Sequence, residues 1–296
     1  MNREYATLPK VSVVITNYNY GRFLQQTIES VLSQTYPNIE VIIVDDGSTD
    51  ETWEVIAKYP QITVIRQHRE GVSVARNKGA MAASGDYLAF LDSDDMWAPQ
   101  KIEKQVQKFL NNPDLGAVTV GTIHIDSHGN QMYIDLQGEE GRLAEKILLF
   151  HRPNIYPSGM MITREAFERV GGFDANLSTA ADLDFAFRVA HHYPYGHIPE
   201  ALCYYRHHGA NMHLKLSLFM HDMPIFFEKA LSYPPYSRLR RKAYALYYRV
   251  LAGECWKNYA YGKSVHYILL SITKDPTIMS YYMRKAYDKM RSLISI

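Results

Sequence analysis

The 296-residue sequence has only two cysteines, no long uninterrupted apolar segment, and no apolar segment at its N-terminus. Cys203 and Cys255 lie far apart without metal-ligand spacing, which excludes a disulfide framework and is typical of a reducing compartment. A membrane-spanning helix needs about 20 apolar residues, and a secretory signal peptide needs an apolar core. We expect neither, and we predict a cytoplasmic protein that is soluble or lies peripherally on the cytoplasmic face of the membrane.

The net charge is close to neutral, at +1, so the composition does not indicate a nucleic acid partner. The charge is uneven, however, because residues 237–296 contain 12 lysines and arginines against 3 acidic residues. Basic, tyrosine-containing amphipathic helices fit a surface that rests on anionic lipid. Packing against the rest of the chain and a homodimer interface are the alternatives for this tail.

Strand and helix patterns alternate through the first hundred residues. Short β-branched or apolar runs predict strands at 11–16, 40–44, 62–65 and 87–91, and helical spacing of apolar residues predicts helices at 22–34, from 48 or 49 to 58, and at 73–83. This alternation with short links is typical of βαβ units and a parallel sheet. Ligands of such sheets bind beyond the carboxyl ends of the strands, and polar residues follow three of the four predicted strands.

The pattern continues less regularly to residue 212. Predicted helices cover 99–110, 164–170 and 181–192, predicted strands cover 117–125, 160–163 and 201–206, and 124–141 reads as a polar hairpin or loop. From residue 213 the pattern is helical throughout. We therefore predict an α/β domain over residues 1–212 and a helical C-terminal region over residues 213–296.

Asp92-Ser93-Asp94 directly follows the fourth predicted strand. Two carboxylates with one residue between them can hold a hard divalent cation, which takes oxygen ligands and leaves positions open for phosphate oxygens. Such a cation neutralises the charge that develops on a departing diphosphate. The alternative is that the acidic residues only begin the next loop and cap a helix, but their place after a βαβ strand favours the metal site. Asp95 is assigned to capping or to support of the site.

Three further groups are candidates for donor binding and chemistry. Asp45-Asp46 ends the second predicted strand and can accept hydrogen bonds from a nucleobase or a ribose, although Asp-Gly-Ser also commonly forms a turn. Asp182 begins a predicted helix, whose dipole favours a carboxylate and suits a general base; ordinary helix-terminal charge is the alternative. After the last predicted strand, Arg206 could clamp a diphosphate and His208 could complete a metal site.

Taken together, these segments resemble the family 2 glycosyltransferases, which have the GT-A fold. The resemblance covers about residues 10–211. It rests on Val13-Val14-Ile15-Thr16-Asn17-Tyr18-Asn19, Ile43-Val44-Asp45-Asp46-Gly47-Ser48-Thr49-Asp50, Ala75-Arg76-Asn77-Lys78-Gly79-Ala80, Phe90-Leu91-Asp92-Ser93-Asp94-Asp95, Gly171-Gly172-Phe173-Asp174, Asp182-Leu183-Asp184 and Tyr205-Arg206-His207-His208.

The resemblance implies a fold, a set of roles and a reaction. The fold is α/β of the GT-A type, a Rossmann-like and mostly parallel sheet flanked by helices, with a C-terminal helical extension. A nucleotide-sugar site is implied at Thr16, Asn17, Tyr18, Asn19, Asp46, Arg76 and Asp92, to which Asp45, Ser93 and Arg206 are added from their positions. Asp94 matches the metal ligand, with Asp92 and His208 as further candidates. Asp182 matches the catalytic base.

These roles imply an inverting, metal-dependent glycosyltransferase that uses Mn²⁺ or Mg²⁺. A UDP-sugar would donate its sugar to a hydroxyl of a saccharide or of a lipid-linked saccharide, in polysaccharide or glycoconjugate synthesis. We expect acceptor contacts from 124–141, 157–159 and the tail. The family usually has Glu before the base, whereas Ala181 stands here, which we interpret as altered acceptor geometry. The alternatives are a non-catalytic nucleotide- or sugar-binding scaffold, and a sugar nucleotidyltransferase, which normally has a Gly-rich basic loop where Asn17-Tyr18-Asn19 stands.

Overall fold

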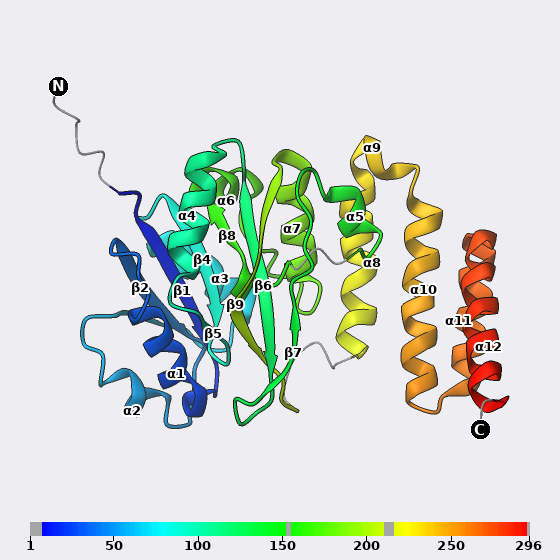
Figure 1. Ribbon diagram of the computed structural model, residues 1–296, viewed down its shortest axis with the longest axis horizontal. Coiled ribbons are helices and arrows are strands. Elements are labelled where there is room, and N and C mark those ends of the chain that lie inside the picture. Colours follow the sequence, from blue (N-terminus) through cyan, green and yellow to red (C-terminus); the bar gives the residue numbers. More distant parts are fainter. Residues whose placement is uncertain (1–7, 152–154, 210–215, 295–296) are drawn as a thin grey trace. The chain divides into compact units, whose positions relative to one another are not determined.

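The computed structural model describes residues 8–151, 155–209 and 216–294, and within them the chain forms a nine-stranded mixed sheet (Figure 1). The strands are β1 (Val11–Asn17), β2 (Ile39–Asp45), β3 (Thr63–Arg66), β4 (Tyr87–Asp92), β5 (Met96–Trp97), β6 (Ala117–Ile125), β7 (Gln131–Asp135), β8 (Met161–Thr163) and β9 (Tyr195–Arg206). Their order is β3-β2-β1-β4-β8-β6-β9-β5, and β7 pairs with β6.

The predicted parallel core is confirmed. β1 pairs in parallel with both β2 and β4, and β2 pairs in parallel with β3. Thr16 stands opposite Val44 on one side and Asp92 on the other, and Asn17 stands opposite Asp45. This register brings the ends of three strands to one edge, which is where the sequence places its polar clusters.

The second half of the sheet is mixed. β8 is antiparallel to β4 and β6, β5 is antiparallel to β9, and β7 forms an antiparallel hairpin with β6, while β6 and β9 are parallel. β9 begins at Tyr195, six residues before the predicted start, and it crosses Pro199 at an irregularity in the β6–β9 register. Proline cannot donate a ladder hydrogen bond, and this interruption concealed the first half of the strand.

Helices cover the sheet on both faces (Figure 1). The helices between residues 21 and 192 are α1 (Gly21–Leu32), α2 (Thr52–Ile56), α3 (Val72–Ala82), α4 (Lys101–Asn111), α5 (Ala144–Leu148), α6 (Arg164–Val170) and α7 (Ala181–His192), with a 3₁₀ turn, η1 (Pro157–Gly159). α1 buries Leu24, Ile28 and Val31 almost completely, and each such side chain stabilises the fold by about 1.5–3 kcal/mol. α3 approaches the sheet closely, since a Cβ on Gly79 would lie 2.3 Å from Cγ1 of Val14.

The helix predicted from residue 48 or 49 to 58 is wrong in its start and its cap. α2 begins at Thr52, and no side chain caps it. The Ser48 hydroxyl instead accepts hydrogen bonds from the Asn17 side chain at 3.1 Å and from the Asn19 backbone N–H at 2.8 Å. Ser48 is thereby committed to the loop after β1, so the segment up to Asp50 remains a turn.

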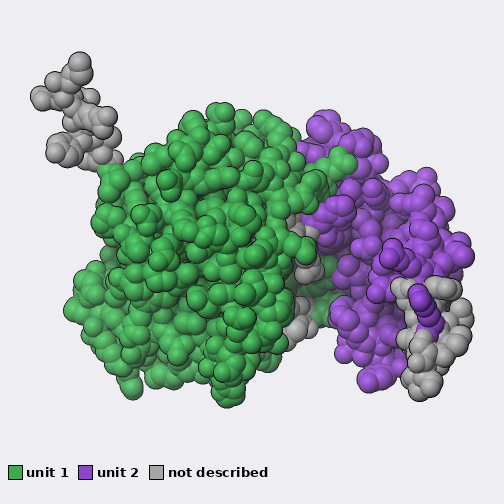
Figure 2. Space-filling view, in the orientation of Figure 1, with its two compact units in different colours: residues 1–147, 152–219 green, residues 148–151, 220–296 purple. Residues whose placement is uncertain are grey.

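The chain divides into two compact units, residues 1–147 with 152–219 and residues 148–151 with 220–296 (Figure 2). The predicted boundary at 212/213 lies outside the described residues. α8 (Leu216–Ser232) runs from the first unit into the second, which contains α9 (Pro234–Ser237), α10 (Arg240–Lys257), α11 (Tyr261–Lys274), the 3₁₀ turn η3 (Pro276–Ile278) and α12 (Met279–Ile294).

Buried serines join α10 and α11. The Ser264 hydroxyl donates to the Ala252 carbonyl at 2.8 Å, and the Ser271 hydroxyl donates to the Ala245 carbonyl at 2.7 Å. The order of these partners makes the two helices antiparallel. No helix among the described residues is long and apolar enough to cross a membrane.

Candidate active site

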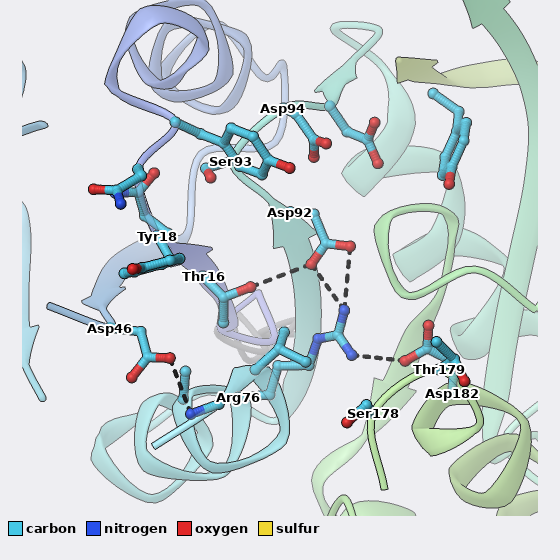
Figure 3. Close-up of a pocket in the computed structure, with 18 residues that line it drawn as sticks. Thr16, Tyr18, Asp46, Arg76, Asp92, Ser93, Asp94, Ser178, Thr179 and Asp182 are labelled. Atoms are coloured by element: carbon cyan, nitrogen blue, oxygen red, sulfur yellow. Dashed lines mark hydrogen bonds and ion pairs between the residues drawn. The ribbon is translucent and has the colours of Figure 1, made fainter. Parts of the chain in front are cut away.

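A pocket of about 560 Å³ lies where the parallel strands end (Figure 3). Its walls come from the loop after β1, from the end of β4, from the start of α3, from the start of α7, and from β9. The lining residues are Thr16, Asn17, Tyr18, Asn19, Tyr20, Asp46, Gly71, Val72, Ala75, Arg76, Asp92, Ser93, Asp94, Asp95, Ser178, Thr179, Asp182 and Tyr205. The pocket therefore joins segments that lie up to 189 residues apart in the sequence.

Arg76 connects two carboxylates across the pocket (Figure 3). Its guanidinium donates to Oδ1 of Asp182 at 2.6 Å and to Oδ1 of Asp92 at 2.8 Å, and only 3% of its side chain is exposed. It also lies 5.1 Å from the ring centre of Phe173. The two carboxylates raise the pKa of Arg76, although burial opposes them, so the guanidinium is a permanent cation between Asp92 and Asp182.

Asp182 stands in the first turn of α7 and faces the pocket, with 37% of its side chain exposed. Burial raises its pKa, Asp92 adds to this effect, and Arg76 opposes it. A carboxylate with a raised pKa and one hydrogen bond to an arginine retains lone pairs for a substrate proton. Asp182 is therefore suited chemically to accept a proton inside the pocket.

Asp94 and His208 form a pair at the opposite wall. Nε2 of His208 lies 2.8 Å from Oδ2 of Asp94, and the Asp94 side chain is 11% exposed. The imidazole packs against two rings that also contact each other, with centroids 5.1 Å away for Tyr20 and 5.4 Å away for Phe23. Burial, with Asp94 and Asp92 nearby, raises the pKa of Tyr20 to about 12, so Tyr20 remains a neutral phenol.

Asp95 supports the neighbouring backbone. Its carboxylate accepts from the Ser158 hydroxyl at 2.6 Å and from the Arg206 N–H at 2.9 Å, and it is 1% exposed. Burial, and then Asp94 and Asp92, raise its pKa well above the ordinary value. Asp95 thus ties the end of β4 to β9, and it caps no helix in the described residues.

Arg206 lies behind the pocket wall, with 2% of the residue exposed. Its Nε donates to the Asp94 carbonyl at 2.8 Å, another nitrogen donates to the Gln26 side chain at 2.9 Å, and the guanidinium lies over the Phe23 ring. These contacts fix the backbone that presents Asp94.

The two aspartates after β2 differ in position. Asp45 is fully buried and accepts from the Asn17 side chain at 3.0 Å and from the Ser48 N–H at 3.0 Å, so it shapes the turn behind the pocket. Asp46 lines the pocket, and its oxygens accept from the Gln67 side chain at 2.8 Å and from the Gly71 N–H at 2.9 Å. The sequence treated the pair as one candidate, but only the second faces the cavity.

The structure brings most of the predicted site residues together. Those in the pocket wall are Thr16, Asn17, Tyr18, Asn19, Asp46, Arg76, Asp92, Ser93, Asp94 and Asp182. Asp45 and Arg206 lie behind the wall, and His208 reaches it through Asp94. The prediction missed Ser178 and Thr179, which precede α7, and Tyr20 and Tyr205; the polar pair just before the helix that carries Asp182 was the available signal.

The pair Asp94 and His208 fits a divalent cation in part. Carboxylate oxygen suits Mg²⁺ and Mn²⁺ alike, while imidazole is a transition-metal ligand, so the donor set favours Mn²⁺. No three acidic, His or Cys side chains among the described residues converge into a metal-binding group. These two side chains would therefore hold the ion at an open site, where oxygens of a bound ligand complete its coordination.

Asp184 and Arg188 form an i,i+4 ion pair on α7. Nη2 of Arg188 lies 2.7 Å from Oδ2 of Asp184, and the arginine also donates to the Val170 and Gly172 carbonyls. Asp184 is 1% exposed, so this carboxylate stabilises the packing of α7 and does not reach the pocket.

An α/β sheet with an acidic pocket at the carboxyl ends of its parallel strands is the architecture of the GT-A fold. The mannosyltransferase PcManGT from Pyrobaculum calidifontis, solved with GDP-Man and Mn²⁺, superposes with a TM-score of 0.65 at 20% identity, over 98% of this chain and 84% of that one. At this identity the likeness establishes the fold, which agrees with the predicted fold class.

Sequence comparisons specify the family. The model of glycosyl transferase family 2 matches residues 12–171. An uncharacterized glycosyltransferase of Nostoc sp. is 37% identical over 219 residues, 69% of this chain and 67% of that protein. The UDP-Glc:α-D-GlcNAc-diphosphoundecaprenol β-1,3-glucosyltransferase of Escherichia coli is 46% identical over 99 residues, 32% of this chain and 39% of that enzyme. The chain belongs to glycosyl transferase family 2, and it is a glycosyltransferase.

Proposed function

We propose that this glycosyltransferase moves a sugar from a UDP-sugar to an acceptor hydroxyl with inversion at the anomeric carbon. The proposal rests on two groups in the same pocket, the Asp182 carboxylate and the Asp94–His208 pair. Arg76 lies between Asp182 and Asp92 and donates a hydrogen bond to each of them. One side of the cavity suits a metal-bound diphosphate, and the other suits removal of a proton.

The donor side of the proposal rests on the loop after β1 and on two aspartates, Asp46 and Asp94. Asp94 and His208 would hold a divalent cation, which supplies charge neutralisation to the departing diphosphate. The Asp46 carboxylate accepts hydrogen bonds only, and the imide N–H of uracil is a complementary donor. The Escherichia coli relative uses UDP-Glc, and the Pyrobaculum neighbour was solved with GDP-Man. A thermal-shift panel of UDP, GDP and ADP with Mn²⁺ tests the base, and stabilisation by GDP alone would contradict the assignment to UDP.

The acceptor side rests on Asp182. This carboxylate would take the proton of the acceptor hydroxyl as the oxygen attacks the anomeric carbon from the face opposite the diphosphate. A single displacement of this kind inverts the anomeric configuration. Proton NMR of the first product formed distinguishes the outcomes, because a product with the donor's own anomeric configuration would exclude the mechanism.

A non-catalytic scaffold is the second candidate. It is favoured by Ala181, which is fully buried at the start of α7 where the family usually has Glu. Hydrolysis of a UDP-sugar in the presence of Mn²⁺ separates the two, since a scaffold binds the donor without releasing UDP. We favour the enzyme because Asp182 itself is present and faces the pocket.

We also propose a cytoplasmic protein whose helical unit rests on the membrane surface and whose acceptor is a saccharide or a lipid-linked saccharide. Tyr261, Val265 and Leu269 recur every four residues along α11, and each is about half exposed or more. Apolar residues at this spacing form one helix face, and the surrounding segment is basic. The Escherichia coli relative acts on a diphosphoundecaprenol-linked sugar.

Flotation with liposomes that contain anionic lipid tests this contact. We expect the full chain to float and Leu269→Glu to remain with the unbound fraction, while Met132→Glu, at a similarly exposed position of β7, floats normally. If sedimentation instead shows a dimer that Leu269→Glu dissociates, and if no liposome binding occurs, the face is a homodimer interface.

A further inference from the structure

A row of aromatic rings crosses the sheet from the pocket to β7. Tyr205 of β9 stands opposite His124 of β6, and His124 stands opposite Tyr133 of β7. Residues directly opposite each other on paired strands point to the same face of a sheet. The three rings therefore form one continuous row, and the row begins at the pocket because Tyr205 lines it.

The rings touch one another along this row. Tyr133 stacks on His124 with centroids 4.1 Å apart and planes 14° apart, and His124 lies 5.6 Å from Tyr205. Tyr156 adds a ring 5.3 Å from Tyr205, and His207 lies 5.1 Å from it. We name these five residues the aromatic row.

The outer end of the row is open to solvent. Tyr133 is 50% exposed although one face of its ring covers His124, which is itself only 4% exposed. If Tyr133 served only to bury His124, the other face of the Tyr133 ring would remain in water, and apolar surface that stays in water adds nothing to the stability of the fold. The exposed half of Tyr133 is thus available to a ligand that extends out of the pocket.

The row is held rigidly. The turn between β6 and β7 is closed by Asp126, whose carboxylate accepts from the N–H groups of His128 and Asn130 at 2.8 and 2.9 Å. The imidazoles of His124 and His207 lie 2.8 Å apart between ring nitrogens. A surface ordered before binding loses less entropy when a ligand arrives.

We propose that the aromatic row is the binding site for the acceptor glycan, with a pyranose ring of the acceptor stacked on Tyr133 and its neighbouring sugar led along the row to the pocket. The inference rests on the proposed function, which needs an acceptor hydroxyl beside Asp182. One face of a pyranose presents C–H bonds of slight positive charge, and an aromatic face is its electron-rich complement.

The row lies on strands that carry none of the carboxylates proposed for the nucleotide. Asp46 follows β2, and Asp92 and Asp94 lie at the end of β4, whereas the row crosses β9, β6 and β7. A ligand on the row reaches the cavity at Tyr205. The row therefore extends the site without overlapping the residues proposed for the donor.

Three variants of the full chain test the proposal. Tyr133→Ala removes the ring, Tyr133→Phe keeps it, and Met132→Ala shortens the preceding side chain, which is 55% exposed on the other face of β7. The probe is a printed array of bacterial surface oligosaccharides, read with UDP and Mn²⁺ present. We expect binding to fall about tenfold in Tyr133→Ala and to remain within twofold in Tyr133→Phe and Met132→Ala.

Calorimetry with UDP and Mn²⁺ separates this inference from the proposed function. All three variants should bind UDP as the original chain does, because the row holds no part of the nucleotide. Failure of the original chain to bind UDP counts against the proposed function. Normal UDP binding with no oligosaccharide binding, or with equal binding by Tyr133→Ala, overturns the acceptor site. Self-association that Tyr133→Ala abolishes, with the array signal unchanged, would also overturn it and assign the row to a protein interface.

Discussion

Replacement of Asp182 by Asn isolates the proposed base from the structure that surrounds it. The amide oxygen can still accept the hydrogen bond that Arg76 donates at 2.6 Å, but an amide does not take up a proton at neutral pH. Positioned general bases contribute about 10²–10⁴-fold to rate, which corresponds to about 3 to 5 kcal/mol of the barrier. We therefore expect kcat to fall by at least about 100-fold.

The cost of this change to folding is small. Asp182 is 37% exposed, and Arg76 keeps its second partner, Asp92. The buried guanidinium therefore keeps a charged partner and a hydrogen bond to the new amide, and no unpaired charge is left inside the fold. The loss of turnover should therefore occur in a folded protein that still binds UDP.

Asp184→Asn is the matched control, because it makes the same change two residues further along α7. Asp184 is 1% exposed and pairs with Arg188 at 2.7 Å, and removal of one partner of a buried pair costs about 3 kcal/mol. We expect this variant to melt several degrees lower while its folded fraction turns over normally. For both variants we would measure turnover by product formation, UDP affinity by calorimetry, and the melting temperature by circular dichroism. If Asp182→Asn retains more than a tenth of the original kcat, the assignment of the base is refuted.

Three further predictions concern the metal, the pH profile and the packing of α3. Asp94→Ala should abolish the Mn²⁺-dependent part of UDP binding in calorimetry, and equal affinity with and without Mn²⁺ in the original chain would contradict the metal site. Because burial raises the pKa of Asp182, the base gains its proton at a higher pH than an ordinary aspartate, so kcat should fall as the pH drops through that raised value. Arg76 opposes this rise in the pKa of Asp182. Arg76→Gln should therefore move the acid limb of the kcat–pH profile to still higher pH, and a move to lower pH would refute the assignment of that limb to Asp182. Gly79→Ala should destabilise the protein by about 1–3 kcal/mol through overpacking, whereas Gly253→Ala in α10, where a Cβ meets nothing within 4 Å, should not, as chemical denaturation will show.

Local sequence determined the parallel core and the ends of its strands. β1 is buried on every residue, and its short run rich in β-branched residues, bounded by a polar turn, favours a strand that is buried on both faces. Because the polar clusters come directly after these strands, their meeting at one edge follows from the topology of βαβ units alone. The same reasoning failed for α2, where the Ser48 hydroxyl has tertiary partners that no local pattern reveals.

The tertiary structure alone separated residues that look equivalent in the sequence. Asp45 and Asp46 are neighbours, yet one is sealed behind the turn and the other lines the cavity. Asp45 ends β2 and is hydrogen-bonded to Asn17 and Ser48, whereas Asp46 lies beyond the strand and accepts from Gln67 and Gly71. Arg206 has the charge to bind a diphosphate, but its hydrogen bonds to the Asp94 carbonyl and to Gln26 place it behind the wall.

The sequence by itself determined that Asp92-Ser93-Asp94 ends a buried parallel strand, which is a consequence of local pattern and chain direction. Only the tertiary structure decided that Arg76, from a separate helix, bridges Asp92 to Asp182. It alone also brought Tyr133 into one row with Tyr205. Contacts of this kind depend on strand register and helix packing between distant segments, and the order of residues along one segment does not encode them.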